Sequence, residues 1–340
     1  MKLSQGVKSS QGAKFSDPAD KTGTRDVIWM SVPMFVELFM QMSVGYVDQI
    51  MLSHLGTQPA AAVGNAIQIL NLVTIALSAM ATASTVLISR ALGAGNKGHI
   101  NEMSMVALVV NAGLALAATF AIFAWWPQLF SVLNVNEDIY AMTKSFLLIV
   151  ASTTILQGVY FAFAAVLRAF ARVGDIMVVN LITNAFNIVG CLVLVNGMPQ
   201  WGIPAMGVEG SALAWSASRV LGVVLVVWFF MRHTTARMRI SCLRPFPLRT
   251  LKQMLGIGVP SSGEQFSYDL SQMVILAFVN MLGSAVVTVK VYCSMCASIA
   301  YTYSIAIAQA TQIVIGYLFG RRQPAKIFHR VWFANVVAMV

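Results

Sequence analysis

The sequence predicts an all-helical integral membrane protein built from two parallel repeats of six helices, the second of which is incomplete. Two observations predict this fold class. Hydrophobic residues make up 58% of the 340 residues and charged residues only 10%, whereas soluble domains carry about 25% charged residues. In addition, one stretch of sequence recurs after an offset of 227 residues, with Pro33 matching Pro260 and Gly93 matching Gly320. A membrane segment repeated in this way is typical of transporters with two related halves.

The apolar runs predict nine membrane-spanning helices. A helix needs about 20 residues to cross ~30 Å of hydrocarbon, and eight of the runs reach that length. None of them alternates with the period of two that barrel strands show. The runs cover residues 27–53, 60–89, 103–126, 140–166, 175–195, 207–231, 255–281, 291–318 and a last one that begins near Val331.

The order of these runs predicts four regions. Residues 1–26 are polar and lack the apolar core of a signal peptide, so we expect a disordered cytoplasmic tail. Residues 27–231 form an amino-terminal lobe of six helices. Residues 232–252 form a linker with six cations and no acid. Residues 253–340 form a partial carboxy-terminal lobe of about three helices, so the chain is expected to be a truncated member of its family.

The positive charges predict the orientation. The net charge is +10, and the Lys and Arg residues fall mostly in the tail or in alternate connections between the runs. Cytoplasmic loops are rich in cations because positive segments resist translocation. We therefore expect a multi-pass protein of the bacterial cytoplasmic membrane, with its amino terminus in the cytoplasm. The same distribution argues against a nucleic-acid partner.

Two acids occupy one face of the first predicted helix. Glu37 and Asp48 are 11 residues apart, which returns to within about 20° on a helix, and Gln41 lies between them on nearly the same stripe. A carboxylate inside the membrane costs roughly 2.5 to 3.5 kcal/mol on insertion scales and is by default a candidate site. The alternative is that each acid pairs with a cation such as Arg219 only to hold helices together.

The seventh predicted helix repeats the acid. Glu264 stands 227 residues after Glu37, and Tyr268 follows it on the same face. Asp269 lies about 140° away around the helix, so two faces are polar and we expect them to line a wet cavity or to contact other polar helices.

Three amides follow one face of the fifth predicted helix. Asn180, Asn184 and Asn187 are spaced by four and three residues, and the stripe continues to Cys191. Such a ladder can hydrogen-bond a solute, or it can join neighbouring helices at modest gain.

Other motifs indicate no enzyme and no cofactor. Residues 93–98 fit G-x-G-x-x-G, but they follow a membrane helix and not a strand. No G-x-x-x-x-G-K-[ST] sequence occurs, so transport would draw its energy from an ion gradient or from a separate ATPase subunit.

Several short stretches together resemble the multidrug and toxic compound extrusion (MATE) transporters. They are Tyr46-Val47-Asp48, residues 90–96, Leu167-Arg168-Ala169, Asn187-Ile188, residues 204–210, and Gly258-Val259-Pro260 with Glu264. The resemblance implies twelve helices in two lobes and export of organic cations or drugs against proton or sodium entry. It also implies that Glu264 and Asp48 are the coupling acids and that Asn180 and Asn187 surround the latter. Cys191 departs from the pattern, because some proton-coupled relatives carry an Asp there.

The leading hypothesis is therefore an antiporter for amphipathic organic cations, with Asp48 and Glu264 as coupling carboxylates and Glu37 as a supporting acid. Sodium, if it is the coupling ion, would bind at Asp48 or Glu264. The expected partners are small-molecule drugs and the lipid bilayer, and the protein is expected to be a monomer. Two alternatives stay open: a flippase for lipid-linked saccharides, and a non-transporting fragment or membrane scaffold.

Overall fold

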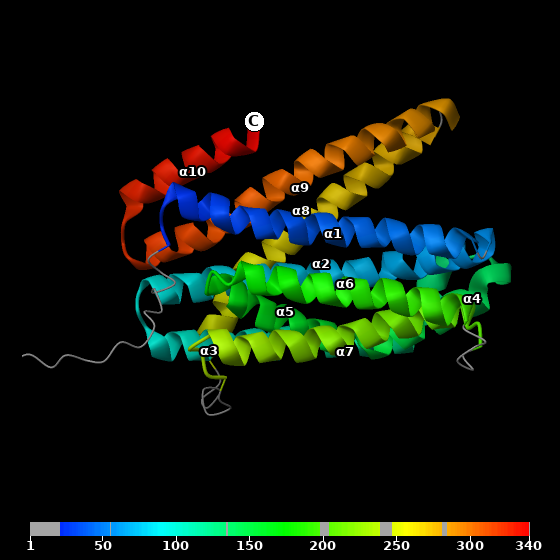
Figure 1. The fold of residues 1–340 in the computed structure, drawn as a ribbon, viewed down its shortest axis with the longest axis horizontal. Helices are drawn as coiled ribbons and strands as arrows, with labels where there is room; N and C mark the ends of the chain where they lie inside the picture. The colour runs from blue at the N-terminus through cyan, green and yellow to red at the C-terminus, as the bar shows by residue number, and fades with distance from the viewer. Residues whose placement is uncertain are drawn as a thin grey trace, which may run out of the picture.

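The computed structural model describes residues 21–54, 56–133, 135–197, 204–238, 247–280 and 284–339. Within these ranges the chain forms ten helices and no strand. Figure 1 shows them as a long bundle in which most helices run along the same axis. The helices are α1 (Thr24–His54), α2 (Thr57–Gly93), α3 (Lys97–Val132), α4 (Glu137–Ser152), α5 (Thr154–Ala169), α6 (Val173–Asn196), α7 (Gly207–His233), α8 (Leu248–Asn280), α9 (Ser284–Gly320) and α10 (Pro324–Met339).

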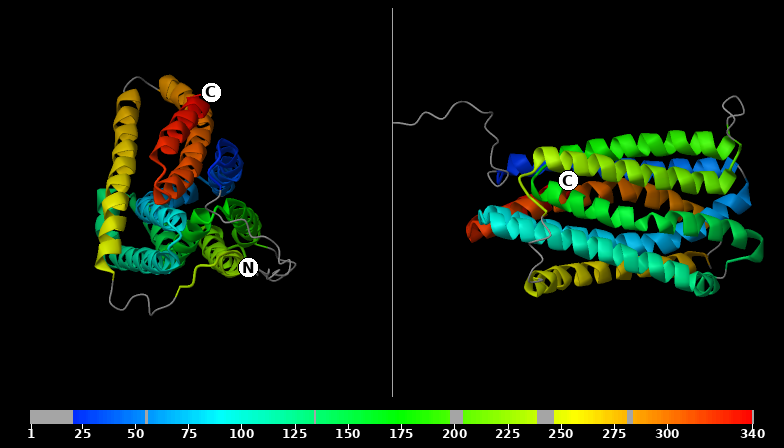
Figure 2. Two further views of the ribbon diagram at one scale, coloured as in Figure 1. Left: turned by 90° about the vertical axis from the view of Figure 1, so that its left-hand side faces the viewer. Right: turned by 90° about the horizontal axis from the view of Figure 1, so that it is seen from below.

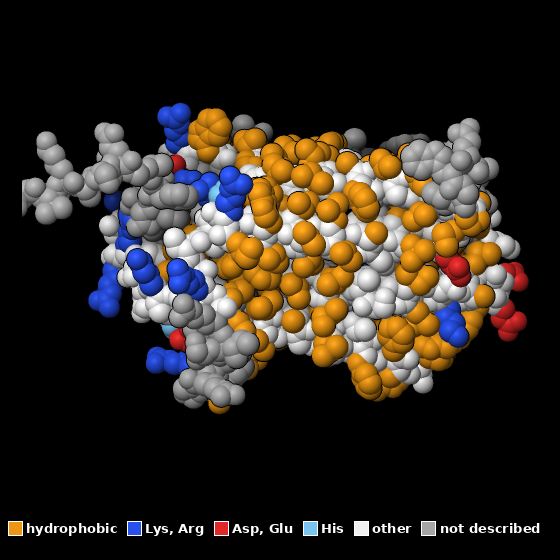
Figure 3. Space-filling model, turned by 60° about the horizontal axis from the view of Figure 1, so that its bottom comes forward, with side chains coloured by type: hydrophobic (Ala, Val, Ile, Leu, Met, Phe, Trp, Pro, Cys, Tyr) orange, Lys and Arg blue, Asp and Glu red, His pale blue; other side chains and the backbone are white. Residues whose placement is uncertain are grey.

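The helices have the length and composition of membrane spans. Among the described residues, six helices are long and apolar enough to cross a membrane, or seven if the bent pair α4 and α5 is one span. Helix α8, whose middle carries Glu264 and Asp269, is not among them, although the sequence predicted a span there. Figure 3 shows hydrophobic side chains over the middle of one face and Lys and Arg gathered at one end.

The predicted fourth span is wrong in one respect, because residues 140–166 do not form one straight helix. Helices α4 and α5 meet at Thr153 with a bend of 45°. At the bend, the Val150 carbonyl oxygen accepts two hydrogen bonds. One comes from the Thr153 hydroxyl at 2.9 Å, and the other from Arg219 Nη1 of α7 at 2.9 Å. A partner from another helix thus stabilises the break, as transmembrane helix breaks require.

The last predicted span also begins earlier than expected. Helix α10 starts at Pro324, not near Val331. Proline suits the first turn of a helix, because its missing N–H would have no partner there.

The internal repeat is confirmed by the helix boundaries. Helices α2 and α9 both contain 37 residues, and each end of α9 lies 227 residues after the matching end of α2. The starts of α3 and α10, at Lys97 and Pro324, show the same offset. Figure 1 shows α2 and α9 running in the same direction. The repeat is therefore parallel, as predicted.

The two copies meet through reciprocal contacts between α2 and α9. A Cβ placed on Gly93 would lie 2.8 Å from Tyr317 Cα, and one on Gly320 would meet the Arg90 carbonyl. Because Tyr317 is the repeat equivalent of Arg90, these are the same contact made twice. Such reciprocity is the signature of a two-fold relation. The absence of side chains at both glycines lets the helices approach closely.

The carboxy-terminal helices are built onto the first two. Helix α8 packs on α2, and α9 packs on both α1 and α2, as Figure 2 also shows. The buried core at this junction includes Met34, Ile88, Ile313 and Leu318. The division into two lobes stays a prediction, and part of the predicted linker, residues 239–246, lies outside the described residues.

Candidate functional site

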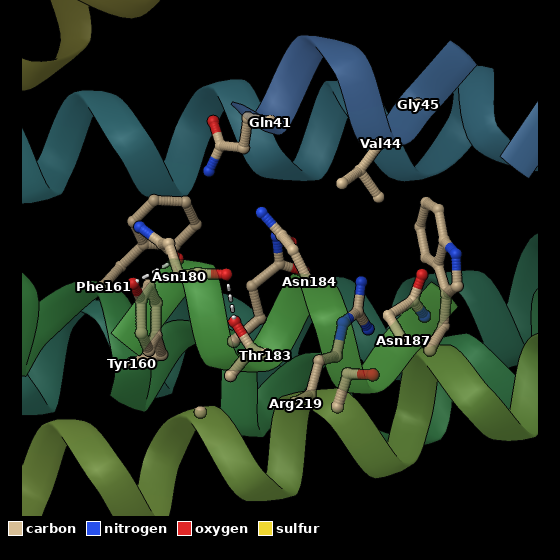
Figure 4. Close-up of a pocket in the computed structure, with 14 residues that line it drawn as sticks. Gln41, Val44, Gly45, Tyr160, Phe161, Asn180, Thr183, Asn184, Asn187 and Arg219 are labelled. Atoms are coloured by element: carbon tan, nitrogen blue, oxygen red, sulfur yellow. Dashed lines mark hydrogen bonds between the residues drawn. The ribbon is translucent and has the colours of Figure 1, made fainter. Parts of the chain in front are cut away.

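A cavity of about 290 Å³, lined by both polar and apolar side chains, opens inside the first six predicted spans. Helices α1, α5, α6 and α7 supply its walls (Figure 4). We call it the amino-terminal cavity. Its lining residues are Gln41, Val44 and Gly45 of α1; Gln157, Tyr160 and Phe161 of α5; Asn180, Thr183, Asn184 and Asn187 of α6; and Trp215, Ser218, Arg219 and Gly222 of α7.

The amide stripe predicted on the fifth span faces this cavity. Asn180, Asn184 and Asn187 all line it. Tyr160 Oη of α5 donates a hydrogen bond to Asn180 Oδ1 at 2.8 Å. Three buried atoms of the stripe, Asn180 Nδ2, Asn184 Nδ2 and Asn187 Oδ1, have no hydrogen-bond partner among the described residues. Since an unsatisfied buried polar group costs about 1 to 3 kcal/mol, these atoms call for water or a solute in the cavity.

Cys191 does not continue the stripe into the cavity. It is buried with Val195 and Ala214 in a separate small cluster. Its sulfur lies 3.9 Å from the Ser211 hydroxyl. The predicted ladder therefore ends at Asn187.

One cation lines the amino-terminal cavity. Arg219 Nη1 donates to the Val150 carbonyl and, at 3.3 Å, to Thr153 Oγ1. Arg219 has no ion pair with a described acid. None of the lining side chains is an Asp or a Glu. The described wall of the cavity is thus net positive.

Glu37 is paired, but with a cation other than the one considered from the sequence. Its side chain is only 3% exposed, and its Oε1 accepts a hydrogen bond from Arg168 Nη2 at 2.6 Å. Arg168 directly follows the fourth predicted span, where the cation pattern predicts a cytoplasmic connection, whereas it sits in the last turn of α5 and points into the bundle. Arg219 was considered as a partner for the acids, and it does not pair with Glu37.

The other predicted residue of α1 that the structure fully describes, Gln41, lines the amino-terminal cavity. Asp48 belongs to α1, but its side chain lies outside the described residues. Its place at the site stays a prediction.

The acids of α8 form a second polar region, apart from the cavity. Glu264 is exposed, and Asp269 Oδ1 accepts a hydrogen bond from Gln265 Nε2 at 3.4 Å. The ring of Tyr268 stacks on Tyr301 of α9 with 5.9 Å between centroids. Neither acid has an ion pair within the described part of the chain.

The fold agrees with the comparisons. The MatE family model matches residues 33–193 and 260–340. The chain belongs to the MatE family. It is 32% identical over 306 residues to "Uncharacterized transporter YisQ" of Bacillus subtilis, a match that covers 90% of this chain and 66% of that protein. It is 26% identical to "Probable multidrug resistance protein NorM" of Thermotoga maritima, covering 76% of this chain and 54% of that protein. The chain thus spans about two thirds or less of the length of these curated relatives.

Solved MATE structures share the fold. A MOP superfamily transporter from Pyrococcus furiosus superimposes with a TM-score of 0.85 at 19% identity, covering 96% of this chain and 72% of that one. A MATE transporter in complex with MaD5 superimposes with a TM-score of 0.87 at 19% identity. The prediction of a MATE-like membrane fold is confirmed. The family is one of multi-pass membrane transporters.

Several residues of the amino-terminal cavity and the partner of Glu37 were not predicted from the sequence. Tyr160 and Thr183 line the cavity beside the amides, and Arg168 neutralises Glu37. Thr183 follows Asn180 by three residues, so the helical spacing that marked the amides could have included it. No spacing could have joined Glu37 to Arg168, because 131 residues separate them. Among the described residues, no group of three or more His, Cys, Asp or Glu could hold a metal ion.

Proposed function

We propose that the protein is a cation-coupled antiporter that exports amphipathic organic compounds across the cytoplasmic membrane. Proton or sodium entry would supply the energy. The proposal rests on a difference in ion pairing between two acids that occupy equivalent positions in the repeat. Glu37 is neutralised by Arg168, whereas Glu264 has no ion pair among the described residues. An unpaired carboxylate on a membrane helix is suited to binding a proton or a sodium ion.

The mechanism assigns Glu264 as a coupling acid of the second repeat and Asp48 as its counterpart in the first. When an ion neutralises the carboxylate, a cationic solute held by it is released. Glu37 acts in support by fixing α1 to α5 through Arg168. Tyr268 lies four residues after Glu264, and its ring stacks on Tyr301 of α9 to give an aromatic surface for an organic cation.

The distribution of charge supports an orientation with the amino terminus in the cytoplasm. Lys and Arg gather at one end of the molecule in Figure 3. That end includes the last turn of α2, with Arg90, and the turn after α9, with Arg322. Cytoplasmic ends of membrane proteins are enriched in Lys and Arg.

The test is transport in proteoliposomes. Purified protein is reconstituted, and movement of the fluorescent cation ethidium is followed while sodium and proton gradients are imposed one at a time. We expect one gradient to drive ethidium transport and its collapse to stop it. Ethidium movement that ignores both gradients would reject the antiporter.

A further inference from the structure

We infer that the amino-terminal cavity binds an oxyanion, a carboxylate or a phosphate, carried on a flat aromatic or apolar body. This inference rests on the proposed function and assigns the amino-terminal cavity to an anionic solute, whereas the cationic solute of the proposed mechanism is held at Glu264 of α8. The residues that carry it are Arg219 and Asn184, which supply donors, and the rings of Tyr160, Phe161 and Trp215, which supply flat walls (Figure 4).

The first step concerns the charge of Arg219. Its guanidinium lies in the middle of α7, a helix with the composition of a membrane span. Among the described residues it hydrogen-bonds two neutral oxygens, those of Val150 and Thr153, and both bonds use Nη1. An arginine has five N–H donors and no acceptor. No described residue accepts a hydrogen bond from its Nε or Nη2, and its charge has no described counter-ion.

The second step concerns the donors beside it. Asn184 Nδ2 is buried and has no partner among the described residues. Figure 4 shows Asn184 and Arg219 reaching into the same space from α6 and α7. A charged group inside the membrane costs several kcal/mol unless it is compensated. An oxyanion would supply the missing charge and accept short, charge-assisted bonds from the guanidinium.

The third step concerns size and shape. The cavity volume of about 290 Å³ lies at the lower end of the roughly 300 to 1,000 Å³ of small-molecule sites. A second hollow of about 440 Å³ shares Gln41, Gln157, Trp215 and Arg219 with it. The guanidinium can therefore be reached from both spaces. A two-ring aromatic acid fits these dimensions, whereas an organic cation would face the uncompensated charge of Arg219.

Binding of matched probes tests the inference. Protein in phosphatidylcholine nanodiscs is titrated with 2-naphthoate, with the neutral 2-naphthamide and with 2-naphthyl phosphate. We expect both anions to bind at least tenfold more tightly than the amide. In Arg219→Gln we expect this preference to fall to within about twofold, while Arg219→Lys keeps most of it. Arg322→Gln, which removes an exposed cation in the turn after α9, should keep all of it.

A second variant covers the case in which Arg219→Gln fails to fold, since Arg219 also supports the bend between α4 and α5. Asn184→Asp keeps Arg219 and places a carboxylate in the cavity, and it should weaken 2-naphthoate binding at least tenfold. Equal binding of 2-naphthoate and 2-naphthamide to the unaltered protein would overturn the inference.

Two further measurements are made. The first identifies the source of the anion, and the second tests the proposed function independently of the oxyanion site. Adding phosphatidylglycerol to the nanodiscs displaces 2-naphthoate if a lipid headgroup is the natural occupant, and leaves it bound if a soluble acid is. Both results keep the oxyanion site. Gradient-driven ethidium transport is measured on the same preparation. Loss of transport with the anion preference intact would reject the antiporter alone. Gradient-driven transport without any anion preference would reject this inference alone.

Discussion

Arg168 Nη2 lies 2.6 Å from Glu37 Oε1 and joins the last turn of α5 to the middle of α1 inside the bundle. The two side chains are 18% and 3% exposed. The pair cancels the charge of an acid that would otherwise be isolated in an apolar environment. The repeat equivalent of Glu37, Glu264, has no such partner in the described part of the chain. The two equivalent acids therefore lie in different environments, since Glu37 is ion-paired and Glu264 is not paired with any described residue.

The first prediction concerns this pair. Arg168→Gln should destabilise the protein by about 3 to 5 kcal/mol, because it leaves the Glu37 carboxylate buried without a counter-charge. Glu37→Gln should cost a similar amount. The double variant should cost clearly less than the sum of the two, since no charge is then left unpaired. Denaturant unfolding in detergent micelles measures all three.

Arg322→Gln is the matched control, because it removes an exposed cation and should change stability by less than about 0.5 kcal/mol. If the two single changes add without coupling, then the ion pair does not fix α1 to α5.

The second prediction concerns the contact between the repeats. Gly93→Ala and Gly320→Ala should each destabilise the protein by about 1 to 3 kcal/mol, because a Cβ has no room at either place. The contacted atoms belong to the backbone, those of Tyr317 and Arg90, and cannot swing away. The two losses should be similar, since the contacts are related by the repeat. Thermal unfolding followed by size-exclusion chromatography measures them.

Gly113→Ala provides the control, because a Cβ there would meet nothing within 4 Å. It should be neutral or slightly stabilising, as alanine favours the helix. A Gly93→Ala protein as stable as Gly113→Ala would show that α2 and α9 do not pack as described.

The repeat could be predicted because it is marked by single residues that can be matched directly in the sequence. Pro33 and Gly93, with their equivalents Pro260 and Gly320, mark a helix interior and a helix end that sequence comparison can align. The amides of α6 were also predictable as one face, because residues three and four apart on a helix lie side by side.

The bend at Thr153 could not be predicted, because residues 140–166 contain no proline that would mark a kink, and the bend is supported from outside by Arg219 of α7. The partner of Glu37 was missed for a related reason. A cation near the end of a predicted span is interpreted from sequence as a cytoplasmic charge. Only the packing of α5 on its neighbours shows that the Arg168 side chain points inward. Contacts between distant helices leave no periodic signal in the sequence.

The third prediction concerns orientation. Thr235 follows α7 and is exposed at the basic end, and the predicted linker around it carries six cations. In a background without native cysteines, Thr235→Cys should resist an impermeant thiol reagent in intact cells and react after permeabilisation. Asn136→Cys, exposed at the opposite end before α4, should react in intact cells. The reverse pattern would place the amino terminus outside.

The last prediction concerns coupling. Glu264→Gln keeps the shape of the side chain and removes its titratable charge, so it should reduce gradient-driven ethidium transport by more than about tenfold. Folding should be unaffected, because Glu264 is exposed and makes no ion pair among the described residues. Asp48→Asn should have a similar effect if both repeats bind ions. Transport in proteoliposomes is compared with expression and thermal stability of the same variants.

Glu137→Gln, at the exposed start of α4, removes an acid outside the proposed machinery and should transport normally. The comparison with Glu37→Gln separates coupling from structure, because that change should lower stability and transport together. Glu264→Gln should lower transport alone. If it transports as well as Glu137→Gln, the second repeat does not hold the coupling ion at this acid. A normal Asp48→Asn together with an inactive Glu264→Gln would confine coupling to the second repeat.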